Sequence, residues 1–170
     1  MRFRFDSTEE PMQKMKLKIE INNAEHFSVF GHTTKNFSVE SEWFSGSCQI
    51  TTFTIEEIMG TKLRALYQRK KGRDLFDFAC AFEQFPKLSD KNLVDCFLAY
   101  MKYGGHNVTR AQFEIALNEK RNDPAFTNDI EPLLSTDSSS FNQQNTFEDV
   151  GKRLISLIPG LPWAGNTIRK

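Results

Sequence analysis

The sequence lacks the features of a disulfide-stabilised, secreted or membrane-spanning protein. Its three cysteines, Cys48, Cys80 and Cys96, are odd in number and show no C-x-x-C spacing, which argues against a disulfide framework and against a zinc ribbon. No apolar run approaches the roughly 18 residues that a membrane helix needs. The charged N-terminal sequence MRFRFDSTEEP has no apolar core of a signal peptide. We therefore expect a cytoplasmic protein with no membrane partner.

The chain also lacks an excess of charge of either sign. Its 22 basic and 22 acidic residues give a formal net charge of zero, so the whole-chain charge gives no argument for nucleic-acid binding. Hydrophobic residues make up 39%, which is low for a compact enzyme, but the 16 phenylalanines predict an aromatic-rich core. A length of 170 residues suits one domain, or one domain plus a fragment.

The first third of the chain predicts β-structure. We expect the polar residues 1–14 to be extended or frayed, and the strictly alternating MKLKIEIN at 15–22 to form a strand with one buried face. Three residues would share that face: Leu17, Ile19 and Ile21. The sequence NFSVESEW, the turn signal SGS at 45–47 and the following CQITTF predict a hairpin. Residues 15–53 are therefore interpreted as a small sheet, the remnant of a larger one, because so few strands leave a face and edges without partners.

Residues 54–170 predict a C-terminal helical domain. Thr54-x-x-Glu57 has the pattern of a capping box, in which the hydroxyl accepts from an early backbone N–H and the glutamate reaches back. Gly72 separates this first helix from a second. Further helices are expected over 90–103, 109–122, 128–134 and 146–158. Strands followed by helices give an α+β fold, a small N-terminal sheet followed by a helical bundle.

The first two predicted helices carry charged residues on apolar faces. Lys62 falls within an apolar stripe at about 100° per residue. That stripe consists of Ile55, Ile58, Met59, Leu63 and Leu66. Burying an ammonium is costly unless it is paired with an anion. Asp74 and Asp77 flank the apolar face of the second helix, and an antiparallel helix pair would bring Lys62 toward one of them.

The sequence RKKGR at 69–73 joins these two helices and places four cations within five residues. Beside a helix N-terminus, such a cluster is a candidate phosphate or RNA-backbone site. Simpler interpretations remain open for these residues. Lys62 and Asp74 form a purely structural ion pair in one of them, since an acid is favoured in the first turn of a helix. The basic cluster is then a solvated loop.

The stretch TIEEIMGTKLRALYQRKKGRDLFD, from Thr54 to Asp77, resembles the AbiEii/AbiGii-type nucleotidyltransferase toxins. The shared pattern is E-E-hydrophobic-x-x-T-K-L-x-A-L, followed by R-x-K-x-R-D-hydrophobic-hydrophobic-D. KLKIEIN, DIEPLL and LIPGLPW are also similar, so the resemblance runs from about Lys16 onward. These toxins belong to type IV toxin–antitoxin and phage abortive-infection systems, which implies a cognate antitoxin as partner.

The resemblance implies a polymerase-β-like fold that transfers a nucleotide from a nucleoside triphosphate, with Mg²⁺, to an acceptor, for several members tRNA. It makes Lys62 the catalytic lysine that neutralises triphosphate charge, and Asp74 a catalytic aspartate that orients Lys62 or an attacking group. Three basic residues would hold nucleotide or RNA phosphates: Arg69, Lys71 and Arg73. Glu20 and Asp77 are secondary candidates.

Two motifs of that family are absent from the sequence. There is no Gly-Gly or Gly-Ser loop between a strand and a helix, because Gly46-Ser47 lies in the predicted hairpin, and there is no Asp-x-Asp pair. The ligands for Mg²⁺ are therefore not expected in this chain. We expect the C-terminal part of a longer enzyme, inactive alone or dependent on a separately encoded N-terminal half. The alternatives are a non-catalytic remnant that binds RNA or an antitoxin, and a helical interaction domain whose Lys–Asp pair is structural.

Overall fold

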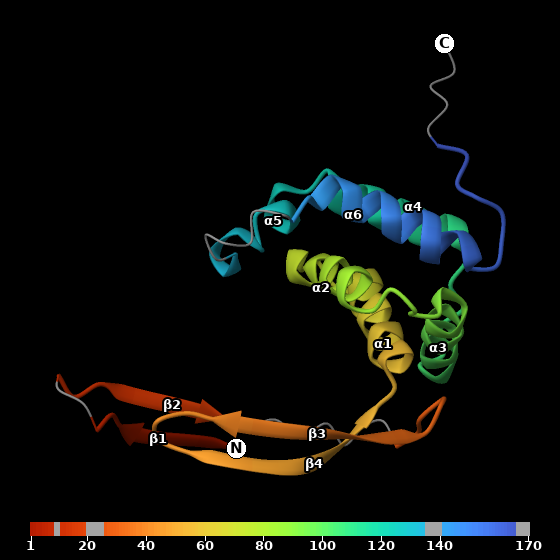
Figure 1. The fold of residues 1–170 in the computed structure, drawn as a ribbon. Helices are drawn as coiled ribbons and strands as arrows, with labels where there is room; N and C mark the ends of the chain where they lie inside the picture. The colour runs from red at the N-terminus through yellow and green to blue at the C-terminus, as the bar shows by residue number, and fades with distance from the viewer. Residues whose placement is uncertain (9–10, 20–25, 135–140, 166–170) are drawn as a thin grey trace.

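The computed structural model describes residues 1–8, 11–19, 26–134 and 141–165. Two β-hairpins occupy the first third of the chain, and a helical region follows them (Figure 1). The hairpins lie on one side of the helical region, and the last strand leads directly into the first helix. The predicted α+β class is confirmed. In place of one small sheet, the strands form two separate two-stranded sheets.

The first hairpin pairs β1 (Arg2–Asp6) with β2 (Lys14–Lys18) in antiparallel register. Strand β1 lies in the segment for which only an extended or frayed conformation was expected. The predicted buried face is wrong, because both strands are exposed along their whole length. Leu17 and Ile19 keep 51% and 42% of their surface exposed, since a lone hairpin has no second layer over it. Ile21 and Glu20 lie outside the described residues.

The second hairpin pairs β3 (His32–Glu40) with β4 (Ser45–Phe53), in a register that runs from His32 opposite Phe53 to Glu40 opposite Ser45. The hairpin was predicted, but its turn was placed wrongly at 45–47, which are the first residues of β4. The chain reverses at 41–44 instead, where the Ser41 hydroxyl accepts a hydrogen bond from the Phe44 N–H at 3.1 Å. A serine side chain that hydrogen-bonds within its own turn favours a chain reversal there, so the turn forms at Ser41 and not at Gly46.

The helical region begins with α1 (Ile55–Gln68), α2 (Gly72–Gln84), α3 (Asp90–Tyr103) and α4 (Arg110–Arg121). These are followed by α5 (Pro124–Thr127), the 3-10 turn η1 (Glu131–Leu133) and α6 (Gln143–Asp149). A π-helical turn η2 (Val150–Leu154) and a 3-10 turn η3 (Ile155–Leu157) prolong α6. The predicted helical segments are confirmed, with the expected 128–134 piece replaced by α5 and η1.

Helix α1 begins where the sequence predicts, because the Thr54 hydroxyl accepts a hydrogen bond from the Glu57 N–H at 3.3 Å. The helix packs closely on α3 at Gly60. A Cβ atom at that position would lie 2.6 Å from the Cβ of Cys96. Only glycine therefore permits the two helix backbones to approach so closely, and α1 is fixed in position and rotation by α3.

The core lies among the helices and is rich in aromatic side chains, as predicted. Five of the largest fully buried residues are phenylalanines: Phe78, Phe97, Phe113, Phe126 and Phe147. Cys96 is buried with them, and this burial raises the pKa of its thiol to about 12. Cys80 is half-buried. Within the described part of the chain, no helix combines the length and apolarity needed to cross a membrane.

Candidate functional site

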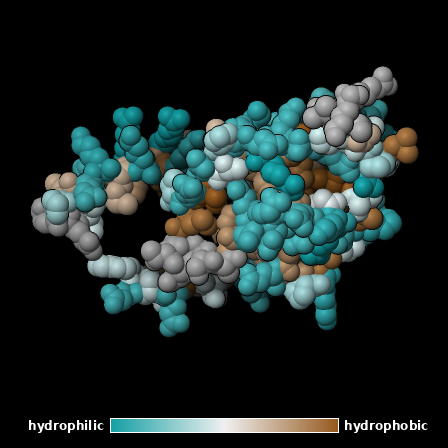
Figure 2. Space-filling view, turned by 90° about the horizontal axis from the view of Figure 1, so that it is seen from above, coloured by the Kyte–Doolittle hydropathy of each residue, from teal (hydrophilic) through white to brown (hydrophobic). Residues whose placement is uncertain are grey.

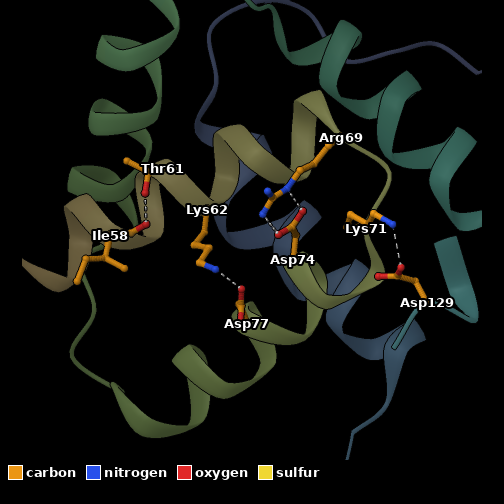
Figure 3. A network of polar contacts seen from close by, with 8 residues as sticks. All are labelled: Ile58, Thr61, Lys62, Arg69, Lys71, Asp74, Asp77 and Asp129. Carbon is orange, nitrogen blue, oxygen red and sulfur yellow. Dashed lines mark hydrogen bonds and ion pairs between the residues drawn. The ribbon is translucent and has the colours of Figure 1, made fainter. Parts of the chain in front are cut away.

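Helices α1 and α2 present two ion pairs to one another, one above the other along the helix pair (Figure 3). Lys62 Nζ lies 2.7 Å from Asp77 Oδ2. Arg69, the residue that follows the end of α1, donates two hydrogen bonds to Asp74, from Nε to Oδ2 at 2.7 Å and from Nη2 to Oδ1 at 2.6 Å. We call these four side chains the α1–α2 ladder.

The two rungs of the ladder differ in burial. Asp74 is completely buried, although Arg69 keeps half of its side chain exposed. Hydrogen bonding to Asp74, opposed by burial, raises the pKa of Arg69, so the guanidinium stays charged. Lys62 and Asp77 are 39% and 36% exposed. We call the Arg69–Asp74 pair the inner rung and the Lys62–Asp77 pair the outer rung. The inner rung holds a buried carboxylate in place, whereas the outer rung leaves an ammonium accessible to a ligand.

The helix pair was expected to bring Lys62 toward Asp74 or Asp77, and the structure pairs it with Asp77 and not with Asp74. Asp77 forms an ion pair with Lys62, and Arg69 donates hydrogen bonds to both carboxylate oxygens of Asp74. The expectation that Lys62 must meet an anion is confirmed, because its ammonium pairs with Asp77 and its side chain stays 39% exposed. In this arrangement Asp74 orients Arg69 and not Lys62.

The basic loop between the helices is largely matched by carboxylates. Besides the Arg69–Asp74 contact, Lys70 lies 3.5 Å from Asp123, and Lys71 lies 3.3 Å from Asp129. Burial alone would raise the pKa of Asp129, but Lys71 and the backbone N–H of Arg73 hold it below its usual value. The loop's four cations thus face three acids, which removes most of the positive field expected from RKKGR.

Gly72 places this loop against the α5–η1 segment. A Cβ atom there would lie 2.4 Å from the carbonyl oxygen of Phe126, so no other residue fits without a backbone shift. The same contact brings Asp129 to the N-terminus of α2. A carboxylate at that end of a helix is stabilised by the helix dipole. Arg73, the remaining cation of the loop, is exposed.

Glu57 is a buried charged centre that the sequence interpretation missed. Its carboxylate accepts hydrogen bonds from the Ser28 hydroxyl (2.9 Å), the Val29 N–H (2.9 Å), the Phe30 N–H (3.0 Å) and the Tyr100 hydroxyl (2.7 Å). Burial alone would raise the pKa of Glu57, yet these four donors together hold it below its usual value. The carboxylate thus ties the segment before β3 to α1 and α3. The first half of the predicted capping box, the hydrogen bond to the Thr54 hydroxyl, is confirmed. The second half is wrong, because the Glu57 carboxylate accepts from these four groups and not from the N-terminus of its own helix.

Lys120 is a second buried charge that was missed. It is 5% exposed and its ammonium donates to the Tyr67 carbonyl at 3.0 Å, near the C-terminal end of α1. Burial, with the nearby charge of Lys70, lowers its pKa. The signal that could have found it is the one applied to Lys62: Lys120 continues the buried stripe of Phe113 and Leu117 at helical spacing.

One cleft of the described part of the chain lies apart from the ladder residues. A cleft of about 740 Å³ lies between α4, the α6–η2 segment and the C-terminal residues. Charged residues of both signs line it, among them Arg110, Glu114 and Lys152. Neither Lys62 nor Asp74 does. We place more weight on the ladder, because its charges converge between two helices whose sequence is the most distinctive of the chain.

The described residues contain no cluster of metal-ligand side chains. Nowhere among residues 1–8, 11–19, 26–134 and 141–165 do three or more His, Cys, Asp or Glu side chains gather in a way that could hold a metal ion. The acids of the ladder are each engaged by a cation. No step is therefore assigned to a metal held by these residues.

The family model described as "Nucleotidyl transferase AbiEii toxin, Type IV TA system" matches residues 1–153. The match spans both hairpins, the α1–α2 ladder and the helical region as far as η2. No curated protein and no solved structure matches the chain.

Proposed function

From the premise that this chain belongs to the AbiEii nucleotidyl transferase toxin family of type IV toxin–antitoxin systems, we propose that it supplies the triphosphate-facing wall of a nucleotidyl transfer site. The observation that carries this proposal is the outer rung of the ladder. Lys62 is partly accessible and is held by one carboxylate, Asp77, that is itself only partly exposed. A phosphate oxygen can replace that carboxylate at little cost, because exposed ion pairs contribute little to stability.

The transfer that we propose uses a nucleoside triphosphate and an RNA acceptor such as tRNA. A hydroxyl oxygen of the RNA forms a bond to the α-phosphorus. The bond from that phosphorus to the bridging oxygen breaks, pyrophosphate leaves, and the hydroxyl proton passes to solvent. Lys62 neutralises charge on the leaving phosphates. Asp74 acts as a positioning residue that aims Arg69, and Arg69 and Arg73 contact the phosphates beside it.

The metal-binding acids must come from outside the residues described. The sequence contains no Asp-x-Asp pair, and the described residues offer no metal-ligand group. We propose that a further polypeptide segment provides them and that this chain is inactive until it is joined by that segment. Membership of a toxin–antitoxin family supports a cognate antitoxin as partner. We propose that such a toxin acts on tRNA in the cytoplasm during phage infection.

The second candidate, a non-catalytic remnant that binds RNA or an antitoxin through RKKGR, is less favoured by the geometry. The carboxylates of Asp74, Asp123 and Asp129 already offset most of that loop's charge. A polyanion would have to displace them.

The test is a transfer assay with labelled nucleoside triphosphates and total tRNA. The chain is assayed alone and mixed with the product of the reading frame immediately upstream. We expect label in tRNA only from the mixture, and a loss of about a hundredfold or more in Lys62→Met. Lys91→Met is the matched control, because Lys91 also pairs with a single exposed aspartate, Asp95, but lies on α3. Absence of label under every condition, or equal losses in both variants, would overturn the proposal.

A further inference from the structure

The cleft of about 740 Å³ lies between α4 and the helical stretch formed by α6, η2 and η3. On α4 its lining residues repeat at helical spacing and so share one helix face, from Arg110 through Glu114 and Leu117 to Arg121. None of the residues assigned to the proposed function lines this cleft. A volume of this size suits an organic ligand and is too large for a simple inorganic anion.

The floor of the cleft is apolar and closely packed. Leu117, Phe147 and Ile155 line it, and they keep only 7%, 2% and 1% of their surface exposed. The half-buried indole of Trp163 adds a further wall. Figure 2 looks down on the face that carries α4 and α6 in Figure 1, and it shows brown hydrophobic side chains between teal hydrophilic ones. The cleft therefore offers apolar and aromatic contact surface, which a planar ring can cover.

The chain turns back over α4 to bring Trp163 to the cleft. Gly160 adopts φ +114°, a conformation that favours glycine, and the Arg110 N–H donates to the Pro159 carbonyl at 2.9 Å. The Trp163 N–H donates to Glu114 Oε2 at 2.5 Å, while Glu114 Oε1 accepts from Arg110 Nε at 2.7 Å. These hydrogen bonds hold the indole in place as a wall of the cleft.

Two cations on opposite walls can meet a negative charge. Arg121 is exposed, and its guanidinium carbon lies 5.1 Å from the centre of the Phe147 ring. Lys152 lies 3.0 Å from Glu148 in an exposed ion pair, and such a pair exchanges partners at little cost. The planar guanidinium of Arg121 suits a phosphate, and the ammonium of Lys152 adds a point charge from the facing wall.

Gly151 leaves room in the wall of the cleft. Among the described residues, no atom lies within 4 Å of the place where a Cβ at this position would be. Packing therefore does not require this glycine, which distinguishes it from Gly60 and Gly72, and its small size keeps the cleft open. Gly151 also belongs to the π-helical turn η2, a rare irregularity of helices that occurs frequently at functional sites.

We propose that this cleft binds a nucleotide unit, with its base on the apolar floor beside Trp163 and its phosphate between Arg121 and Lys152. A wholly apolar ligand would not use the two cations, and a lone anion would leave the floor uncovered. A base joined to a phosphate matches both parts, because bases stack on aromatic rings and on guanidinium planes. A free nucleotide and the exposed end of an RNA chain present this same chemistry. The binding does not require the transfer activity proposed above.

The experiment follows the fluorescence of Trp163 in the full chain. The sequence has two tryptophans, and Trp43→Phe removes the other one, which is 82% exposed. In this background the fluorescence reports on the cleft alone. Titration with AMP should quench it along a saturating curve, because the base lies beside the indole. Inorganic phosphate should not quench it, because phosphate has no ring to cover the floor.

Two further variants in the same background test the two parts of the cleft. In R121Q/K152Q the loss of both cations should weaken AMP binding by about tenfold or more. Gly151→Leu fills the cleft and should abolish the saturating quenching. Its midpoint of urea unfolding should be unchanged or higher, because leucine has a higher helix propensity than glycine.

The matched control for the cations is K87Q/K91Q. Both lysines are exposed and neither lines the cleft. The control loses the same two positive charges as R121Q/K152Q, and we expect its affinity for AMP to equal that of the background variant.

A tRNA transcript distinguishes the two sources of the nucleotide unit. Displacement of AMP by the transcript would assign the cleft to the end of an RNA chain. Retention of AMP would assign it to a free nucleotide. Both results support a nucleotide unit as the ligand.

Three outcomes would overturn the inference. One is quenching that does not saturate, or that is equal in Gly151→Leu. Another is an equal loss of affinity in K87Q/K91Q and R121Q/K152Q, which would mean that only net charge matters. The third is a loss of quenching in Lys62→Met, which would place AMP at the ladder. If no condition gives nucleotide transfer while the quenching still depends on Gly151 and Arg121, the proposed function fails and the nucleotide cleft stands.

Discussion

The helical region and the β1–β2 hairpin use the same kinds of residue in opposite ways. In the helical region, phenylalanines such as Phe97 and Phe113 are completely buried. Cations there meet carboxylates, as in Arg153, which donates to both oxygens of Asp90 at 3.0 and 2.7 Å. In the hairpin, Phe3 and Phe5 remain 44% and 49% exposed, and cations lie opposite cations.

This difference indicates where the stability of the fold resides. Buried phenylalanines and matched charges stabilise the helical fold whether or not a ligand is present. The exposed apolar side chains of the hairpin contribute little to stability, because no second layer covers them. Within the helical region, the ion pair of Lys62 with Asp77 is likewise partly exposed.

The largest predicted effect compares one phenylalanine from each region. Phe97→Ala removes a fully buried ring and should lower the free energy of unfolding by about 4 kcal/mol. Phe5→Ala removes a half-exposed ring and should cost less than about 0.5 kcal/mol. Urea unfolding followed by circular dichroism measures both. Similar costs would show that the hairpin is as tightly packed as the core.

Removing the buried carboxylate of Glu57 should have the next largest effect. Glu57→Ala leaves the N–H groups of Val29 and Phe30 and the hydroxyl of Tyr100 without their acceptor, and should cost about 3 kcal/mol in unfolding free energy. Glu56→Ala is the control, because Glu56 accepts only one long bond, from the Ser89 N–H at 3.4 Å. A Glu57→Ala cost no larger than the control's would refute the central role of this carboxylate.

The lowered pKa of Glu57 also predicts how the unfolding free energy changes at acidic pH. Its folded-state pKa lies below the ordinary value of 4.5, so the unfolded chain binds its proton first as pH falls. The stability that Glu57 contributes is fully present above pH 4.5 and is lost as pH falls through the folded-state pKa. Unfolding free energies measured from pH 6 to pH 3 should fall more steeply in the original chain than in Glu57→Gln. Parallel curves would contradict the assignment.

The two rungs of the α1–α2 ladder should differ in their contribution to stability. Arg69→Met leaves the buried Asp74 without its partner and should destabilise the fold by about 2 kcal/mol. Lys62→Met breaks an exposed pair and should change stability by less than about 0.5 kcal/mol. Both values come from chemical unfolding. A cost for Lys62→Met that equals the cost for Arg69→Met would make the outer rung structural.

The smallest effect is expected at Lys120. Lys120→Met removes a buried ammonium whose pKa is lowered by burial, but it also takes the donor from the Tyr67 carbonyl. These effects oppose one another, and we expect a net change within about 1 kcal/mol. Thermal unfolding at neutral pH suffices to measure it. A loss well above that value would mean that Lys120 caps α1 more strongly than one hydrogen bond explains.

Most of the helical fold could be predicted from the sequence, because the signals are local. Thr54 caps α1 as its residue type requires, and helical periodicity located α3 and α4 almost to the residue. The strand alternation at 15–18 was also predicted, but its burial was not. Alternation fixes which side chains share a face, whereas burial depends on whether another layer covers that face.

The candidate site was less predictable, because partners are chosen in three dimensions. Sequence spacing brought Lys62 near both Asp74 and Asp77, and only the approach of Arg69 decides which one it meets. Both lysines on apolar stripes find polar partners, but Lys62 meets Asp77 and stays partly exposed, whereas Lys120 is buried. Glu57 gave no local signal, since its donors lie far away along the chain, at Val29, Phe30 and Tyr100.

The most direct test measures nucleotide transfer and unfolding free energy on the same preparation of Lys62→Met, mixed with the upstream gene product. The account predicts a loss of transfer of about a hundredfold or more with unfolding free energy within about 0.5 kcal/mol of the original chain. Transfer that is unchanged, or that falls only in proportion to the protein that has unfolded, would contradict the assignment of Lys62 to the triphosphate.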